Sequence, residues 1–440
     1  IEKGFARIVL GPVERERYYL PHRDVTKTKN SAISKMRVVF DCSAGDQNKL
    51  SLNGCIADAP NNLPSIADVV VQFRSEDFAF TADVVEFYHQ VLLGENSIGA
   101  LRFLWRSFQH AQPKMYELLT NTFGEKASSY RSVETVNFHA MKYDEEFPLE
   151  VAILRNRRYS DDLSYTDADE SKLISTFMNL KLILQQGGFR LSKIATNSRK
   201  LKDLLDPADL VVGKEFASGA HDDASALGIG WSPSSDELFY RGIDGIIEFA
   251  NSLPVTKRTV LAVTPRVFDS LGLIHPYIVQ SKMLLKAAWQ LSCAWDDPLP
   301  NELQRAWTNW LEQLPALKNI RIPRNIVMSN AEKMTIEAYG DASEKAIGIA
   351  VYVRCQKGDH VTSNLIGAAS RVKSQSPTST IARLELIAMF EAASLAATRA
   401  ETLGIPRKYI YLYTDSRIAY HWVRAKTADC WQVFVANRVR

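Results

Sequence analysis

The fold of this chain is decided by the stretch Arg155-Asn156-Arg157-Arg158-Tyr159-Ser160-Asp161-Asp162-Leu163-Ser164-Tyr165. Polar residues interrupt its aromatic and aliphatic positions, which is typical of a β-hairpin with Asp161 and Asp162 at its tip. Adjacent carboxylates repel one another unless a cation lies between them, and a divalent cation would also bind substrate phosphates. An isolated Asp-Asp pair is more often a solvated surface turn. A further acid elsewhere in the chain must therefore decide between a metal site and a surface turn.

That further acid is Asp83, which follows the alternating stretch Phe78-Ala79-Phe80-Thr81-Ala82. The alternation predicts a buried strand that ends at the carboxylate. Three carboxylates from two separate elements are what a two-metal clamp on a phosphoryl group requires for an in-line displacement. We therefore expect Asp83, Asp161 and Asp162 to hold two ions of Mg²⁺ or Mn²⁺.

Nine segments of the chain together resemble reverse transcriptases, and among them the Bel/Pao group of long-terminal-repeat retrotransposons. In order along the chain they are Tyr19-Leu20-Pro21-His22, Arg37 to Ala44, Ser51-Leu52-Asn53, Phe73-Arg74, Asp83 to Gln90, Phe103-Leu104-Trp105, Phe123-Gly124, Tyr159 to Leu163 and Gly188 to Lys193. The resemblance implies a fragment of a Pol polyprotein. Its fold class would be an α+β polymerase right hand of fingers, palm and thumb, followed by a mainly helical connection and a C-terminally truncated α/β ribonuclease H-like domain.

The resemblance also implies roles for single residues of the polymerase site. Arg37 would contact the incoming triphosphate, since a planar guanidinium suits bidentate phosphate binding; an edge-strand salt bridge is the alternative. Tyr88 would lie under the sugar and exclude a 2′-hydroxyl, although a core tyrosine is also possible. Lys193 would give a proton to the leaving pyrophosphate. The glycine-containing stretch from Leu227 to Trp231 resembles the hairpin that grips the primer terminus.

Several local patterns predict secondary structure around these motifs. A polar loop is expected from Thr26 to Ser34, before a strand from Met36 to Phe40. Apolar residues at helical spacing predict helices over Leu63–Phe73 and Ser171–Leu184. In the segment that begins Phe123-Gly124, Ser129 replaces the proline of the family, and a serine can still cap the helix that follows.

Composition bounds the class of protein. A chain of 440 residues with 46% hydrophobic and 23% charged residues is typical of a globular protein with more than one domain. No apolar run approaches the ~20 residues of a membrane span. The cysteines are odd in number and form no Cys-x-x-Cys pair, which favours reduced thiols over a zinc site or disulfides; they are Cys42, Cys55, Cys293, Cys355 and Cys430.

The net charge of +3 does not by itself indicate nucleic acid binding. Two basic clusters could neutralise phosphates, although each also fits a solvated surface. They are Arg155, Arg157 and Arg158 before the acidic turn, and Lys193, Arg199, Lys200 and Lys202 after it.

Three domains are expected: 1–244 for the polymerase and its primer grip, 245–330 for a Pao-type thumb or connection, and 331–440 for the truncated ribonuclease H-like domain. The middle region resembles a stretch catalogued with Pao elements as a peptidase. Aspartic peptidases need Asp-Thr/Ser-Gly, whereas Asp269-Ser270-Leu271 lacks the glycine.

The last region carries three acids at predicted element ends. A strand from Thr335 to Tyr339 leads to Asp341, and a hairpin partner follows over Ala346–Val353. A helix over Thr378–Ala397 carries Glu385, and a strand over Tyr409–Tyr413 leads to Asp415. Their order resembles the metal-binding acids of retroelement ribonuclease H, whose fourth acid would lie beyond Arg440, so that ribonuclease H activity is not assured.

The sequence thus predicts an RNA-directed DNA polymerase of a retrotransposon. Its partners would be an RNA or DNA template with primer, deoxynucleoside triphosphates, an RNA/DNA hybrid and the rest of the Pol polyprotein, with no membrane. It would act in cytoplasmic, element-encoded particles, or in the nucleus during integration. One alternative is an inactive transposon relic that only binds nucleic acid. The other, an aspartic peptidase, is disfavoured by the missing motif.

Overall fold

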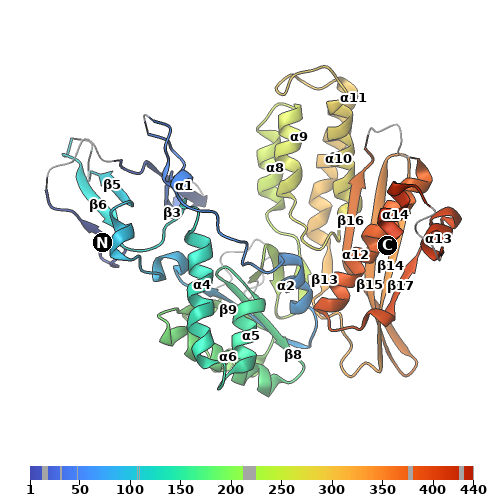
Figure 1. Cartoon of the computed structure of the whole chain (residues 1–440), viewed down its shortest axis with the longest axis horizontal. Coiled ribbons are helices and arrows are strands. Elements are labelled where there is room, and N and C mark those ends of the chain that lie inside the picture. Colours follow the sequence, from blue (N-terminus) through green and yellow to red (C-terminus); the bar gives the residue numbers. More distant parts are fainter. Residues whose placement is uncertain are drawn as a thin grey trace. The chain divides into compact units, whose positions relative to one another are not determined.

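The structure is a computed structural model of the chain (Figure 1). It describes residues 1–11, 18–29, 32–46, 48–106, 108, 110–211, 224–374, 380–425 and 431–439. The chain divides into two compact units. The first unit comprises Ile1–Pro64, Ala82–Leu163 and Ile174–Ser192, and the second comprises Ser65–Thr81, Ser164–Leu173 and Lys193–Arg440.

The first unit begins with small antiparallel sheets. One has the order β1-β6-β5 and the other pairs β2 with β3. Their bounds are β1 (Ala6–Ile8), β2 (His22–Lys29), β3 (Ala32–Phe40), β5 (Arg102–Trp105) and β6 (Lys114–Leu118). The predicted polar loop is wrong, because β2 and β3 occupy most of it as a ribbon. Polar residues and threonine on such a ribbon fit a two-stranded sheet as well as a loop.

Helices α4 (Ser128–Ala140) and α5 (Pro148–Asn156) belong to this unit, α6 (Glu170–Gln186) has residues in both units, and α2 (Ile66–Phe73) belongs to the second unit. The predicted helices therefore occur, but α2 begins after Pro64 because Ser65 accepts a hydrogen bond from the backbone N–H of Asp68 and caps the helix. Helix α6 buries Leu173, Phe177 and Leu180, as its apolar spacing predicts.

A four-stranded sheet carries the predicted catalytic motifs. Its order is β7-β8-β4-β9. The strands are β4 (Phe78–Val84), β7 (Arg158–Tyr159), β8 (Asp162–Asp167) and β9 (Leu191–Thr196). Phe80 and Leu163 are almost fully buried in it, so the sheet forms a rigid base for the acids at its strand ends.

The second unit contains a sheet of order β10-β11-β12-β13 and a helical layer. The strands are β10 (Ala224–Ala226), β11 (Ile229–Ser232), β12 (Glu237–Phe239) and β13 (Arg321–Pro323), and the helices are α8 (Ile243–Asn251), α9 (Lys257–Val263), α10 (His275–Trp289) and α11 (Asn301–Gln313). Trp307 and Trp310 stack at 5.0 Å in the core of these helices. These two tryptophans, three positions apart in the sequence, lie on the buried face of α11.

The same unit ends in a sheet of order β16-β15-β14-β17, one face of which is covered by α12 (Figure 1). The elements are β14 (Lys333–Ala342), β15 (Ala346–Lys357), β16 (His360–Val372), α12 (Ile381–Thr402), β17 (Ile410–Tyr413), α13 (Arg417–Arg424) and α14 (Val433–Val439). The predicted strands and the predicted long helix of this region are present among the described residues. The predicted start of the long helix, Thr378, lies outside the described residues, and Thr380 caps α12.

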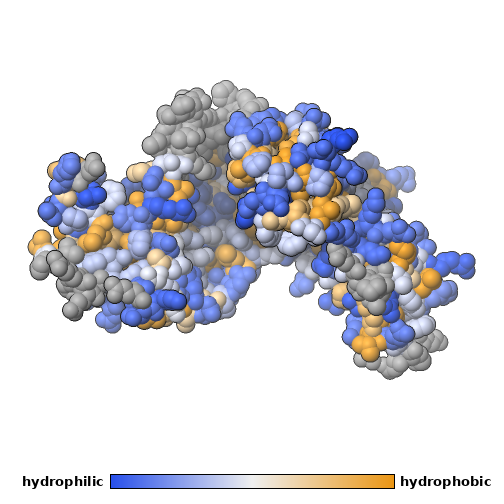
Figure 2. Space-filling view, turned by 90° about the horizontal axis from the view of Figure 1, so that it is seen from above, coloured by the Kyte–Doolittle hydropathy of each residue, from blue (hydrophilic) through white to orange (hydrophobic). Residues whose placement is uncertain are grey.

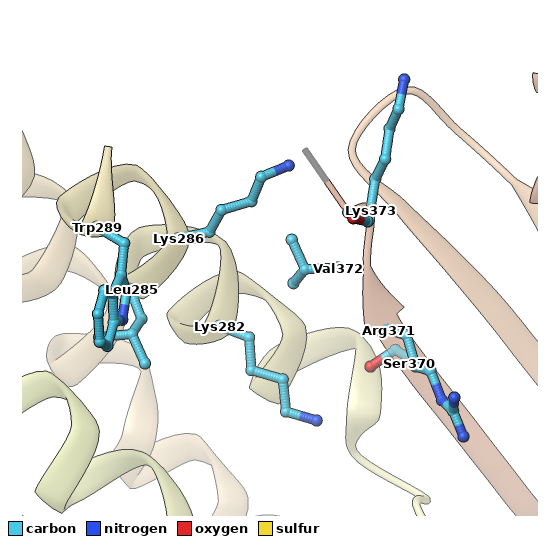
Figure 3. A pocket seen from close by; sticks show the side chains of 9 residues that line it. Lys282, Leu285, Lys286, Trp289, Ser370, Arg371, Val372 and Lys373 are labelled. Carbon is cyan, nitrogen blue, oxygen red and sulfur yellow. The ribbon is translucent and has the colours of Figure 1, made fainter. Parts of the chain in front are cut away.

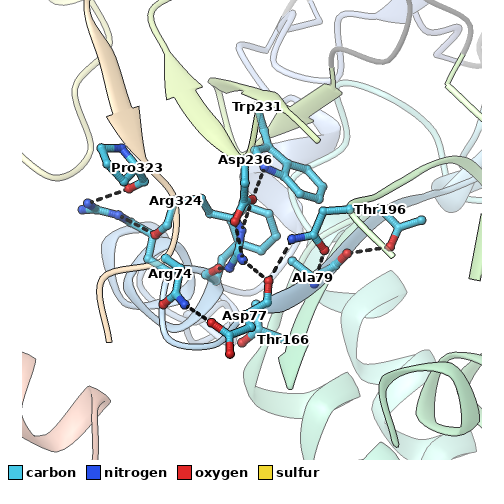
Figure 4. A network of polar contacts seen from close by, with 12 residues as sticks. Arg74, Asp77, Ala79, Thr166, Thr196, Trp231, Asp236, Pro323 and Arg324 are labelled. Atoms are coloured by element: carbon cyan, nitrogen blue, oxygen red, sulfur yellow. Dashed lines mark hydrogen bonds and ion pairs between the residues drawn. The ribbon is translucent and has the colours of Figure 1, made fainter. Parts of the chain in front are cut away.

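A buried pair of arginines joins distant segments of the second unit (Figure 4). The guanidinium of Arg324 contacts Asp236 at 2.6 Å and donates to the carbonyls of Phe73 at 2.8 Å and Asp77 at 2.7 Å. Arg74 donates to the Arg324 carbonyl at 3.3 Å. Burial, together with the charge of Arg324, lowers the pKa of Arg74 to about 10. Neither arginine is therefore available to bind a ligand.

The surface is mixed in character. Figure 2 shows apolar side chains scattered among polar ones over the face drawn. Among the described helices, none has the length and apolar character that a bilayer span requires.

The four described cysteines are free thiols, and burial raises the pKa of Cys42 to about 12. Cys430 lies outside the described residues.

Candidate functional site

The predicted acidic hairpin is confirmed in the first unit. Tyr159 pairs with Asp162, so Ser160 and Asp161 form a tight turn between β7 and β8. Ser160 adopts a left-handed conformation with φ of 55°, as such turns require. The backbone N–H of Val84 donates to the carbonyl of Asp161 at 2.9 Å. The end of β4, where Asp83 lies, is therefore directly beside the turn.

A buried arginine supports this turn through hydrogen bonds to backbone carbonyls. Arg158 is only 2% exposed, and it donates to the carbonyls of Leu154 at 3.2 Å and Ser160 at 2.5 Å. A third bond, at 3.3 Å, reaches the carbonyl of Val133 on α4. Burial lowers the pKa of Arg158 to about 10, and the negative charge of Asp161 opposes this shift. The prediction that Arg158 neutralises phosphates is wrong, because its donors are used inside the protein.

The two residues predicted to bind the nucleotide share an aromatic neighbour. The guanidinium of Arg37 lies 5.6 Å from the ring centroid of Phe123, and the ring of Tyr88 lies 5.0 Å from the same ring. The next residue, Gly124, has a φ of 103°, and a Cβ there would lie 1.8 Å from the carbonyl oxygen of Phe40, so the backbone passes close to the end of β3. No other residue fits at that position. Phe123 is thus a contact between Arg37 and Tyr88 that the sequence motifs alone did not indicate.

Lys193 lies in β9, shortly after a residue that is hydrogen-bonded to the chain just beyond β4. The N–H of Val85 donates to the carbonyl of Arg190 at 2.9 Å, three residues before the lysine. Lys193 itself is exposed and has a φ of 49°. It belongs to the second unit, and its role as a proton donor stays a prediction.

The predicted glycine hairpin is also present. Ala226 pairs with Ile229, which leaves Leu227 and Gly228 as the turn, with φ of 50° and 90°. Positive φ at both positions is the pattern of a type I′ turn. Trp231, at the end of the predicted stretch, is fully buried and donates from its indole N–H to Asp236 at 3.0 Å.

The three acids predicted for ribonuclease H lie at one end of the last sheet. Strands β14 and β17 are parallel, with Tyr339 opposite Tyr413 as the last pair. Asp341, near the end of β14, and Asp415, just beyond β17, each follow two residues later, so they lie at the same level of the sheet. Glu385 comes from α12 and accepts a hydrogen bond from the hydroxyl of Ser416, next to Asp415.

Close packing determines the distance between α12 and this end of the sheet. A Cβ at Gly340 would lie 2.7 Å from the backbone of Ala388, one helical turn after Glu385. Glycine therefore permits the helix to approach the strand beside Asp341.

Both acid sets have the chemistry that divalent metals prefer, because all their ligands are carboxylate oxygens. The backbone brings each set to one place. As positioned, however, the side chains do not converge: no group of three or more acids, histidines or cysteines in the described part of the chain could hold a metal ion. The acids thus fit a divalent metal through the type of their ligand atoms and through the positions of their backbones.

Known proteins resemble this chain in two ways. Residues 256–416 match the family model of the Pao retrotransposon-like RNaseH-like domain, a range that includes Asp341, Glu385 and Asp415. A search of curated proteins gave no match.

Three solved structures of a foamy viral protease-reverse transcriptase share the fold. The complex of its dRH form with double-stranded DNA has a TM-score of 0.59 at 16% identity, over 94% of this chain and 60% of that chain. The complex with an RNA/DNA hybrid has a TM-score of 0.59 at 14% identity, over 100% of this chain and 50% of the other. Another complex with double-stranded DNA gives 0.56 at 15% identity, over 97% and 75%.

This chain therefore spans half to three quarters of those proteins, and at such identities the likeness establishes the fold. Residues 256–416 are thus similar to the Pao retrotransposon-like RNaseH-like domain, and the chain shares its fold with a viral protease-reverse transcriptase, in agreement with the resemblance that its sequence motifs indicated.

Proposed function

We propose that this chain is an RNA-directed DNA polymerase of a retrotransposon, which transfers nucleotides onto a primed RNA or DNA template. The observation that carries the proposal is the hydrogen bond from Val84 to Asp161 at 2.9 Å. It joins two acidic motifs that are far apart in sequence, and neither motif alone would indicate phosphoryl transfer. In the proposed right hand, residues 1–244 form the fingers, palm and primer grip, and 245–330 form the connection.

Asp83, Asp161 and Asp162 would hold two Mg²⁺ or Mn²⁺ ions. When bound, the ions supply Lewis-acid stabilisation of the charge that develops on the transferring phosphoryl group. The carboxylates lie at strand ends of one sheet, and rotation about their side-chain bonds would bring their oxygens to the metal ions.

The remaining residues orient the substrate. Arg37 would bind the triphosphate through its guanidinium, and the ring of Tyr88, held against Phe123, would close the space that a 2′-hydroxyl needs. Lys193 would donate a proton to the pyrophosphate as it leaves. The hairpin at Leu227 and Gly228 would contact the primer backbone.

The second acid set supports a second reaction on the product of the first. Asp341, Glu385 and Asp415 would act on the RNA strand of an RNA/DNA hybrid, as expected of an RNaseH-like domain. The solved structures that share the fold were determined with double-stranded DNA and with an RNA/DNA hybrid, which supports a duplex as the partner of this chain.

The test is extension of a DNA primer on an RNA template. We expect the chain to extend the primer with deoxynucleotides in Mg²⁺ or Mn²⁺, and extension to stop when EDTA removes the ions. Binding of the primed template without extension in either metal would instead identify an inactive nucleic-acid-binding protein. Extension that persists in EDTA would contradict the metal chemistry.

A further inference from the structure

A cationic cleft lies in the second unit between α10 and the end of β16 (Figure 3). Lys282 and Lys286, one helical turn apart, extend from α10 towards the strand, where Arg371 and Lys373 complete the lining. The cavity measures about 600 Å³, and its lining, as far as the structure describes it, contains no carboxylate. Lysines on both sides of a space of this size, Lys282 and Lys286 on α10 and Lys373 just after β16, indicate an anionic occupant.

The charges of this cleft are only partly compensated. Arg371 pairs with Glu391 of α12 at 2.7 Å. For Lys282, Lys286 and Lys373, the described residues provide no ion pair. These three ammonium groups are therefore available to a ligand that brings its own negative charge.

A polar donor lies at the base of the same cleft. The hydroxyl of Ser370 is buried and has no hydrogen-bond partner among the described residues. A buried hydroxyl without a partner has lost its hydrogen bonds to water and gained none in return, which is unfavourable. An oxygen-rich anion such as a phosphate would accept a hydrogen bond from it and from the lysines together.

The register of the sheet connects this cleft to the predicted ribonuclease H acids. Asp341 pairs with Gly348, and Gly348 pairs with Ser370, so the three residues form one row across β14, β15 and β16. Side chains in such a row project from the same face of a sheet. Two strand spacings separate the ends of the row by about 10 Å, which corresponds to about three nucleotides of duplex axis.

The middle of the row is open. A Cβ placed on Gly348 would meet no atom within 4 Å, and the residue is exposed. A glycine in a strand often marks the place where another backbone approaches closely. A nucleic-acid strand could therefore pass over Gly348 between Ser370 and Asp341 without a steric barrier.

We propose that this cleft binds backbone phosphates of an RNA/DNA hybrid and guides one strand over Gly348 towards Asp341. The inference rests on the proposed function, because it assumes that the RNaseH-like domain receives a hybrid. To the proposed function it adds the residues that bind phosphate, the path of the strand, and the distance between the phosphate contact and Asp341. Contacts to phosphates are independent of sequence.

The test measures binding of a fluorescent RNA/DNA hybrid by anisotropy at increasing salt, in EDTA so that no strand is cleaved. The double variant Lys282→Gln/Lys286→Gln removes two charges and keeps most of the side-chain length. We expect the slope of log affinity against log salt to become shallower by about 2. The matched control, Lys333→Gln/Lys357→Gln, removes two exposed charges from the opposite end of the same sheet and should leave the slope unchanged.

A second variant tests the path of the strand. Gly348→Leu fills the open position in the row, so it should weaken hybrid binding while the thermal midpoint of unfolding stays that of the wild type. An unchanged salt slope in the lysine variant, with the wild type still binding the hybrid, would overturn the cleft proposal and leave the proposed function intact. No binding by the wild type at any salt would overturn both.

Discussion

The two acid clusters of this chain are built in different ways. In the first unit the Asp161–Asp162 pair lies on one tight turn, and one backbone hydrogen bond brings Asp83 to it. In the second unit Asp341, Glu385 and Asp415 come from two strand ends and a helix, and they share one end of a sheet through the register of β14 and β17. The first cluster depends on local backbone geometry, and the second depends on how a helix packs against a sheet.

This difference decides which residues support each cluster. The turn is held by the donors of a single buried guanidinium, Arg158. The strand ends are held by a close contact between Gly340 and Ala388 and by the hydrogen bond from Ser416 to Glu385. A change in the first support should therefore remove one activity, whereas a change in the second should first lower the stability of the RNaseH-like region.

The largest loss of stability is expected from Arg158→Met. The substitution leaves the carbonyls of Leu154, Ser160 and Val133 buried without their donor, which should lower the free energy of unfolding by about 3 kcal/mol. A displaced turn should also slow primer extension by about 100-fold. The measurements are urea unfolding and extension rate. Arg155→Met, at an exposed site near the end of α5, should change neither. A wild-type extension rate in Arg158→Met would show that the turn does not need this support.

A smaller loss of stability is expected from Gly340→Ala. The added Cβ would lie 2.7 Å from the backbone of Ala388, so α12 must move, at a cost of about 2 kcal/mol in unfolding free energy. Gly348→Ala is the control on the adjacent strand, since the space around its Cβ is empty. Equal thermal midpoints for the two variants would mean that α12 does not rest on this contact.

Substitution of Tyr88 should change selectivity more than stability. Tyr88→Val opens the space beside Phe123, so the preference for deoxynucleotides over ribonucleotides should fall by about tenfold or more. Single-nucleotide incorporation with each substrate measures this ratio. Tyr88→Phe retains the ring and should retain the preference; if Tyr88→Val retains it as well, Tyr88 is a core residue.

The smallest effect is expected from Ser416→Ala. Ser416 donates to Glu385 and also accepts from the N–H of Ala419, at 3.2 Å, as the cap of α13. Loss of the cap should cost about 1 kcal/mol in unfolding free energy. Ser416→Thr keeps both bonds and should keep wild-type stability in the same urea titration. A loss as large as that of Arg158→Met would show that the second cluster also depends on a single side chain.

The sequence predicted the helices and strands better than it predicted the buried side chains that support them. The acidic hairpin and the strand before Asp83 could be identified because period-2 alternation and turn residues are local signals. The elements around Asp341, Glu385 and Asp415 followed from similar local patterns. The ribbon of β2 and β3 was missed, since its polar residues are typical of a loop as well.

The supports were missed because they depend on contacts between distant segments. Arg158 was interpreted as a phosphate ligand, although its acceptors include the carbonyl of Val133, twenty-five positions earlier. Arg74 and Arg324 form their buried pair across a sequence separation of 250. A single charged residue in a sequence gives no sign of burial, because its acceptors are backbone carbonyls that every residue has.

The most direct test of the account compares wild type and Asp161→Asn in extension of a DNA primer on an RNA template, with binding of the primed template measured in parallel. The account predicts that the wild type extends the primer and that the variant is slower by about 10³-fold, because a carboxylate that holds the metal is lost. Template affinity should stay within a few-fold, since Asp161 does not hold the duplex. Extension at the wild-type rate by Asp161→Asn would contradict the assignment of the turn as the catalytic metal site.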